Sequence, residues 1–129
     1  MATTYAGFAM LESTFNSLDV DRILAMYAED AKFSTNLFGL KEVDKARMRE
    51  FYTDLFGSND GVQFQTRAMG ESTSMLIWEC DVRWKVRKDW PDWGVLRGEE
   101  FAMRGVSVLR FRDGLIVEHK DSFWTVRSM

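Results

Sequence analysis

The chain has 129 residues, a formal charge of −3 and 46% hydrophobic residues. This length predicts a single domain, residues 1–129, and the apolar fraction is high enough to build a core, which excludes a disordered chain. Lys and Arg are spread along the chain instead of clustering, which argues against nucleic-acid binding.

Several residue types that carry other kinds of chemistry are scarce. One cysteine, Cys80, excludes an intramolecular disulfide, and one histidine, His119, argues against a metal site. The glycines are scattered and form no phosphate-binding loop, so we expect no cofactor. The first residues lack a basic region before an apolar run, and no apolar stretch approaches the roughly 18 residues of a membrane helix. We therefore expect a cytoplasmic protein.

The first third of the chain has a helical pattern. Leu11, Phe15 and Leu18 recur every three or four residues, and Asp19 is a suitable N-cap for a second helix whose apolar stripe extends to Tyr27. Tyr27 is therefore expected in the core. A short strand is predicted at 31–35, followed by a third helix from about 42 to 56 with Gly57 as its stop.

The rest of the chain has the pattern of strands. Residues 73–87 alternate between a face rich in Trp and a charged face. Two more strands, 97–112 and 115–127, are joined at Asp113-Gly114, which is a strong hairpin signal. The loop between strand 73–87 and strand 97–112 contains Trp93. Helices followed by antiparallel strands predict an α+β fold.

Two segments carry a resemblance to a known family. Residues 104–121, RGVSVLRFRDGLIVEHKD, resemble the C-terminal hairpin of SnoaL-like polyketide cyclases, and residues 19–31, ending in MYAEDA, resemble the second helix of the same nuclear transport factor 2-like superfamily. The element order agrees over residues 7–126. The resemblance implies a cone-shaped fold of three helices on a curved antiparallel sheet, an apolar pocket between them, and a homodimer.

The candidate catalytic residues come from a comparison within this superfamily. WECDV (78–82) and HKDSF (119–123) are similar to the two aspartate-bearing strands of limonene epoxide hydrolases, which places Asp81 and Asp121 at the two carboxylate positions. Glu79 stands where that family has an arginine, so epoxide opening would need Arg83 or Arg104 instead. The acidic and tyrosine positions of ketosteroid isomerases hold Leu11, Thr35 and Ser107 here, which argues against that mechanism.

Two carboxylates in one apolar pocket share a proton, which suits them to acid/base chemistry. We therefore assign Asp121 as general acid/base, Asp81 as its partner and His119 as an orienting group or second base. Substrate contacts are expected from five further residues, Glu79, Arg83, Arg104, Phe123 and Trp93.

The orientation of strand 73–87 has two readings. From its residues alone, the charged face would meet water and the Trp-rich face would be core. The family resemblance instead implies that the charged face lines the pocket and that Trp78, Val82 and Trp84 contact a second subunit.

These observations favour a cofactor-independent enzyme of the cyclase or isomerase type. Its substrate would be a small apolar molecule, polyketide- or terpene-like. The alternatives are an epoxide hydrolase-like enzyme and a non-catalytic module for ligand binding or dimerisation.

Overall fold

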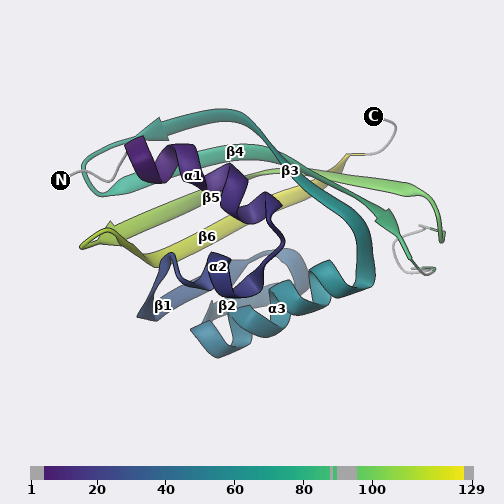
Figure 1. Cartoon of the computed structure of the whole chain (residues 1–129), viewed down its shortest axis with the longest axis horizontal. Coiled ribbons are helices and arrows are strands. Elements are labelled where there is room, and N and C mark those ends of the chain that lie inside the picture. The colour runs from purple at the N-terminus through teal and green to yellow at the C-terminus, as the bar shows by residue number, and fades with distance from the viewer. Residues whose placement is uncertain (1–4, 88, 90–95, 127–129) are drawn as a thin grey trace.

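The computed structural model describes residues 5–87, 89 and 96–126, with side chains from residue 10 onward. It has the predicted α+β architecture (Figure 1). Its elements in chain order are α1 (Tyr5–Asn16), α2 (Val20–Leu24), β1 (Tyr27–Thr35), the 3-10 turn η1 (Leu37–Gly39), β2 (Leu40–Val43), α3 (Lys45–Ser58), β3 (Asn59–Glu71), β4 (Met75–Val86), β5 (Glu100–Arg112) and β6 (Leu115–Val126). Within the described part, no helix is both long and apolar enough to span a membrane.

The six strands form one mixed sheet in the order β2-β1-β6-β5-β4-β3. Strand β1 runs parallel to β6, and all other neighbouring pairs are antiparallel. The expectation of a purely antiparallel sheet is therefore wrong at this one pairing. Parallel neighbours need a long crossover connection, and here α3 and the strands β3, β4 and β5 lie between β1 and β6 in the chain.

The second helix is shorter than its apolar stripe predicts. Asp19 caps it as expected, with its side chain accepting a hydrogen bond from the backbone N–H of Arg22 at 3.2 Å. The helix ends at Leu24, and Tyr27 begins β1. Because the backbone N–H of Ile116 in β6 donates to the Met26 carbonyl, the chain is drawn into the sheet before another helical turn forms.

The third helix also begins and ends later than predicted. Residues 40–43 form β2 against β1, so α3 starts at Lys45, where Asp44 accepts a hydrogen bond from the Arg47 N–H. The helix continues through Gly57 and ends at Ser58. Its buried residues are Met48, Phe51 and Tyr52, whereas Ala46 is exposed.

The hairpin between β5 and β6 forms as predicted. Asp113 and Gly114 both have positive φ angles, 53° and 81°, as a two-residue type I′ turn requires. The register of the two strands then shifts once, between Arg110 and Phe111. From Arg110 onward, each residue of β5 therefore pairs with the residue of β6 one position beyond the one that a count from the turn would give. This difference matters for the site.

The helices α1 and α3 lie against the concave face of the sheet, and the core fills the space between them (Figure 1). Phe15 of α1 lies at the centre, with ring centroids 5.2 Å from Phe64 and 5.5 Å from Trp78. The Trp-rich face of β4 therefore belongs to the core of the single chain. The expectation that Trp78, Val82 and Trp84 contact a second subunit is wrong, because all three are buried within the chain.

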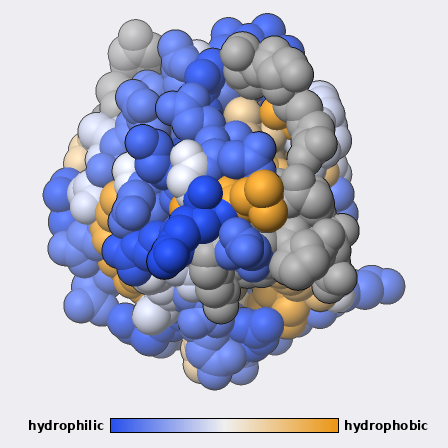
Figure 2. All heavy atoms as spheres, turned by 90° about the vertical axis from the view of Figure 1, so that its right-hand side faces the viewer, coloured by the Kyte–Doolittle hydropathy of each residue, from blue (hydrophilic) through white to orange (hydrophobic). Residues whose placement is uncertain are grey.

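The outer surface differs from this interior. Figure 2 shows one end of the molecule, where hydrophilic side chains predominate and a limited apolar area is visible among them. Charged residues of β4 such as Arg83 and Lys85 are exposed. The two faces of this strand therefore meet different environments, as its alternating sequence requires.

The close approach of β5 and β6 depends on a glycine. A Cβ at Gly105 would overlap the ring of Phe123 and the carbonyl oxygen of Ser122. We expect Gly105→Ala to lower the free energy of unfolding by about 1–3 kcal/mol through overpacking, measured by chemical denaturation. Gly70→Ala is the control, because no atom lies within 4 Å of a Cβ there. Equal stability of the two variants would contradict this packing account.

Candidate functional site

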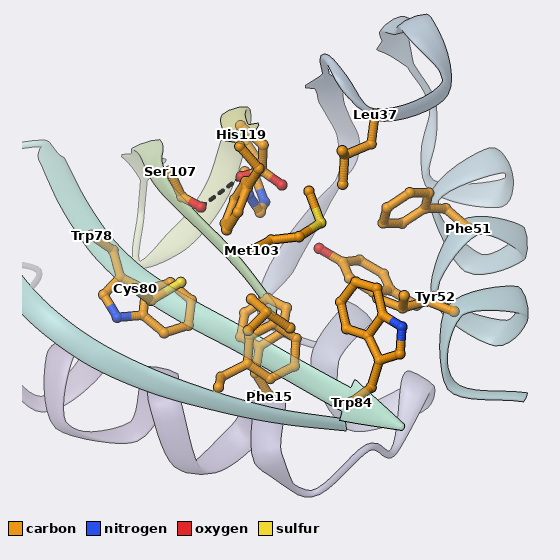
Figure 3. A pocket seen from close by; sticks show the side chains of 15 residues that line it. Phe15, Leu37, Phe51, Tyr52, Trp78, Cys80, Trp84, Met103, Ser107 and His119 are labelled. Carbon is orange, nitrogen blue, oxygen red and sulfur yellow. Dashed lines mark hydrogen bonds and ion pairs between the residues drawn. The ribbon is translucent and has the colours of Figure 1, made fainter. Parts of the chain in front are cut away.

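A pocket opens between the concave face of the sheet and α3 (Figure 3). It holds about 470 Å³ of space, counted out to its open mouth. Its walls are mainly aromatic and aliphatic, with a small set of polar groups. The lining residues are Phe15, Leu37, Phe51, Tyr52, Leu55, Phe64, Trp78, Cys80, Val82, Trp84, Met103, Ser107, His119, Asp121 and Phe123.

Asp121 is the one carboxylate among these lining residues, and two donors hold it. The Ser107 hydroxyl donates to Oδ1 at 2.5 Å, and His119 Nε2 lies 2.6 Å from the same oxygen. The side chain of Asp121 is 10% exposed and that of His119 is 2% exposed. Because the described hydrogen bonds to this carboxylate all end on Oδ1, the second oxygen is left available to a ligand.

The sheet register brings these three groups together. In β6, His119, Asp121 and Phe123 alternate onto the concave face, and Ser107 of β5 is the direct partner of Asp121. On the other side of β6, the ring of Phe33 in β1 packs edge-on against His119 at 5.0 Å. Asp121 and His119 are therefore held by the two strands that flank β6, which are β5 on one side and β1 on the other.

A second layer of polar groups lies behind His119. The Tyr27 hydroxyl is 2.6 Å from His119 Nδ1, and its ring stacks on the imidazole at 5.8 Å. Tyr52 of α3 also lines the pocket. Burial, followed by the nearby Asp121 charge, raises the pKa of Tyr27, and burial is also the main cause that raises the pKa of Tyr52. Both phenols therefore stay protonated.

Asp81 is not in the pocket. It lies on the opposite face of the sheet, where Arg104 Nε donates to its Oδ1 at 2.7 Å and Arg67 lies 3.6 Å from its Oδ2. The hydrogen bond from Arg104 lowers the pKa of this carboxyl. The expected pairing of Asp81 with Asp121 is therefore wrong, because Cys80 and Val82 take the concave face and alternation sends Asp81 outward.

The same alternation of side chains along the strands determines which of the other predicted substrate contacts face the pocket. Glu79 and Arg83 share the outward face of β4 with Asp81, and Arg104 is on the outward face of β5, so none of the three lines the pocket. Phe123 does line it. Trp93 lies outside the described residues.

Three of the polar residues at this site were not predicted to belong to it. Tyr27 was expected only as core, Ser107 was noted only as a replaced acidic position, and nothing in the sequence separated Tyr52 from its apolar neighbours. Counting from the Asp113-Gly114 turn pairs Ser107 with Lys120, whereas the register shift pairs it with Asp121. No local sequence signal marks that shift.

The arrangement suits proton transfer. A buried carboxylate beside an imidazole and a hydroxyl can accept a proton and return it, as acid/base catalysis requires. Cys80 also lines the pocket, but burial raises the pKa of its thiol, so it supplies no thiolate nucleophile. Among the described residues, no cluster of three or more His, Cys, Asp or Glu side chains could hold a metal ion.

This fold and pocket define the nuclear transport factor 2-like class of proteins. Similar solved structures include AclR, a candidate hydroxylase from Streptomyces galilaeus, with 19% identity, a TM-score of 0.79, and 95% of this chain and 77% of that one covered. IdmH, a candidate polyketide cyclase from Streptomyces antibioticus, has 20% identity, a TM-score of 0.76, and coverage of 92% and 90%. A hypothetical protein with a ketosteroid isomerase-like fold from Catenulispora acidiphila, in complex with trimethylamine, has 13% identity, a TM-score of 0.75, and coverage of 92% and 85%.

The family follows from the sequence comparison. The model of the SnoaL-like domain matches residues 9–119, and the chain therefore belongs to the SnoaL-like domain family. No curated protein matches the chain. The structural likenesses are all at low identity and establish the fold, while the chemistry has to be argued from the pocket itself.

The Asp81–Arg104 pair makes a prediction about stability. Because the pKa of Asp81 is lowered in the folded state, the pair stabilises the protein above the unfolded value of about 3.9, and this contribution is lost as the pH falls through the folded value. We expect Asp81→Asn to cost about 1–3 kcal/mol at neutral pH and progressively less below about pH 4. Denaturation across pH measures this.

The control is Asp30→Asn, which breaks the exposed ion pair with Arg112 and should change little. A cost for Asp81→Asn that did not shrink in acid would contradict an ionic contribution from Asp81.

Proposed function

We propose that this protein is a cofactor-independent acid/base enzyme of the cyclase or isomerase type, with Asp121 as its catalytic residue. The observation that carries the proposal is the position of Asp121 as the one carboxylate of an otherwise largely apolar pocket. Both described hydrogen bonds to it, from Ser107 and His119, end on Oδ1. Oδ2 is then the oxygen that reacts with a substrate.

The proposed step is proton abstraction from carbon. Ser107 and His119 hold Asp121 through Oδ1, so Oδ2 can take a proton from a carbon atom next to a carbonyl group. Returning the proton to a different carbon gives isomerisation, and attack of the resulting enol on a second carbonyl gives ring closure. In both cases His119 acts as the group that orients Asp121, through its Nε2 contact at 2.6 Å.

The pocket walls support an apolar ring compound as the substrate. Rings of Phe15, Phe51, Phe64, Trp78 and Trp84 line the pocket, and such walls bind flat hydrocarbon frameworks through burial. Candidate polyketide cyclases occur among the solved structures with this fold, which is consistent with such a substrate. Epoxide hydrolysis has less support, because Asp81 and Arg104 lie on the other face of the sheet.

Hydrogen–deuterium exchange tests the step without knowledge of the natural substrate. A panel of cyclic ketones, with 2-tetralone as the first, is incubated with the protein in D₂O, and loss of the protons next to the carbonyl is followed by NMR. We expect the wild type to accelerate exchange and Asp121→Asn to reduce the acceleration by roughly 10²–10⁴-fold. Asp81→Asn is the matched control and should retain it.

Two outcomes would contradict the proposal. Equal exchange by the wild type and Asp121→Asn would remove Asp121 from the chemistry. Binding of the ketones without exchange would favour a non-catalytic ligand-binding module.

We also propose that the chain forms a homodimer through the outer face of the sheet. No helix covers this face in Figure 1, and it carries Ile77 and Trp124, which are 40% and 51% exposed, beside the half-buried Val106 and Val108. A two-fold axis pairs this face with itself. Arg104 pairs with Asp81 on this face, so the charge of that buried carboxylate is compensated within the chain.

Light scattering on a size-exclusion column tests the dimer. We expect twice the mass of the chain for the wild type and the monomer mass for Trp124→Lys, because a charge replaces apolar contact area. Leu115→Lys at the β5–β6 turn is the control, since Leu115 is similarly exposed but begins β6, nine residues before Trp124 along the strand. A monomeric wild type at high concentration would reject the interface.

A further inference from the structure

The turn between β1 and β2 borders the mouth of the pocket. Leu37 of this turn and Phe51 of α3 both line the pocket, and Figure 3 shows their side chains on the same side of it. Phe38 follows Leu37 in the chain and does not line the pocket. Its ring lies edge-on to that of Phe51, with the centroids 6.2 Å apart, and the residue is 62% exposed. Phe38 therefore lies outside the pocket, at the edge of its mouth.

Hydrogen bonds hold this turn against the pocket wall. The side-chain amide of Asn36 pairs with the backbone of β6, because its Nδ2 donates to the Phe123 carbonyl at 2.7 Å and its Oδ1 accepts from the Phe123 N–H at 2.9 Å. The Thr35 hydroxyl accepts a hydrogen bond from the Leu37 N–H at 3.1 Å. Since Phe123 also lines the pocket, these bonds fix the position of Leu37 and Phe38 relative to the wall.

The backbone of the turn favours a residue other than phenylalanine at position 38. Phe38 and Gly39 have successive positive φ angles, 60° and 63°. Hairpin turns of type I′ require such a pair of angles, and Asn-Gly is the preferred sequence for it. A bulky side chain at positive φ costs backbone energy, and a largely exposed ring recovers little of that energy by burial. Because strain of this kind clusters at ligand contacts, it indicates a role for the Phe38 ring beyond the fold itself.

We propose that Phe38 is a specificity-determining residue, which contacts the part of a ligand that extends beyond the pocket mouth. The ligand class is a linear fused-ring ketone of three or more rings. The inference rests on the proposed function for the placement of the ketone ring at Asp121, and the turn begins beside that residue because Thr35 pairs with Asp121. A further aromatic ring would leave the pocket past Leu37 and Phe51 and meet the Phe38 ring, where burial of both apolar surfaces strengthens binding.

Binding of two ketones of different length tests this contact. 2-Tetralone has two rings, and 3,4-dihydroanthracen-2(1H)-one has the same ketone ring with one more aromatic ring in line. Trp78 and Trp84 line the pocket, so quenching of tryptophan fluorescence measures the Kd of each ketone. We expect Phe38→Asn to weaken binding of the three-ring ketone about tenfold, and binding of 2-tetralone less than about twofold.

The choice of asparagine separates a ligand contact from a structural role. Asparagine is the residue that the turn favours, so Phe38→Asn should keep or raise the midpoint of chemical denaturation while it weakens binding of the three-ring ketone. Phe38→Tyr keeps the aromatic ring and should bind both ketones as the wild type does. Leu115→Asn is the control for loss of an exposed apolar side chain, because Leu115 is 40% exposed and does not line the pocket. It should leave both Kd values unchanged.

The inference is wrong if Phe38→Asn weakens both ketones equally or affects neither, or if the denaturation midpoint of this variant falls. It is also wrong if the wild type binds the three-ring ketone no more tightly than 2-tetralone, because the third ring would then gain nothing at the mouth.

Failure of the proposed function is a different result. In that case the wild type exchanges no deuterium into either ketone, although the third ring still strengthens binding in a way that depends on Phe38. Conversely, exchange that depends on Asp121, with Kd values that do not respond to Phe38→Asn, would support the proposed function and reject this inference.

Discussion

The alternation of side chains along β4 controls the rest of this structure. Neighbouring residues of a strand point to opposite faces, so β4 can present its Trp-rich face or its charged face to the helices, but never a mixture. Packing Trp78 and Trp84 against α1 and α3 removes far more apolar surface from water than packing the charged face would. Once that choice is made, Asp81 has to point away from the pocket.

The two aspartates illustrate how environment separates residues of one type. Asp81 is paired with Arg104 and Arg67, so its charge is compensated and its role is structural. Asp121 has Ser107 and His119 on one oxygen and an apolar pocket in front of the other. A carboxylate held in this way keeps its ability to exchange a proton with a ligand, which a carboxylate clamped between two guanidinium groups does not.

The polar site depends on strand pairings between segments far apart in the chain. Asp121 meets Ser107 because the β5–β6 register shifts once after the turn, and His119 meets Tyr27 because β1 joins β6 in parallel. Both pairings are tertiary features that bring single residues into contact. The pocket thereby acquires three polar side chains on its wall, Ser107, His119 and Asp121, and Tyr27 behind it.

Much of this protein could be predicted from local sequence. The helical stripe through Phe15, the Asp19 cap, the alternation of 73–87 and the Asp113-Gly114 turn are short-range signals, because propensity, capping and turn geometry act within a few residues. They were sufficient for the α+β class and for the presence of Asp121 and His119 on one face of a strand, while the family was predicted from the resemblance of residues 19–31 and 104–121 to a known family.

The tertiary structure decided between the two readings of β4, in favour of the one that its alternating residues indicate, and it alone decided which residues complete the site and where the second and third helices begin and end. The physical reason is common to all three. Burial and strand pairing depend on the sum of contacts between distant segments, so the charged face that the family resemblance assigns to the pocket is turned outward because the Trp-bearing face packs better against the helices.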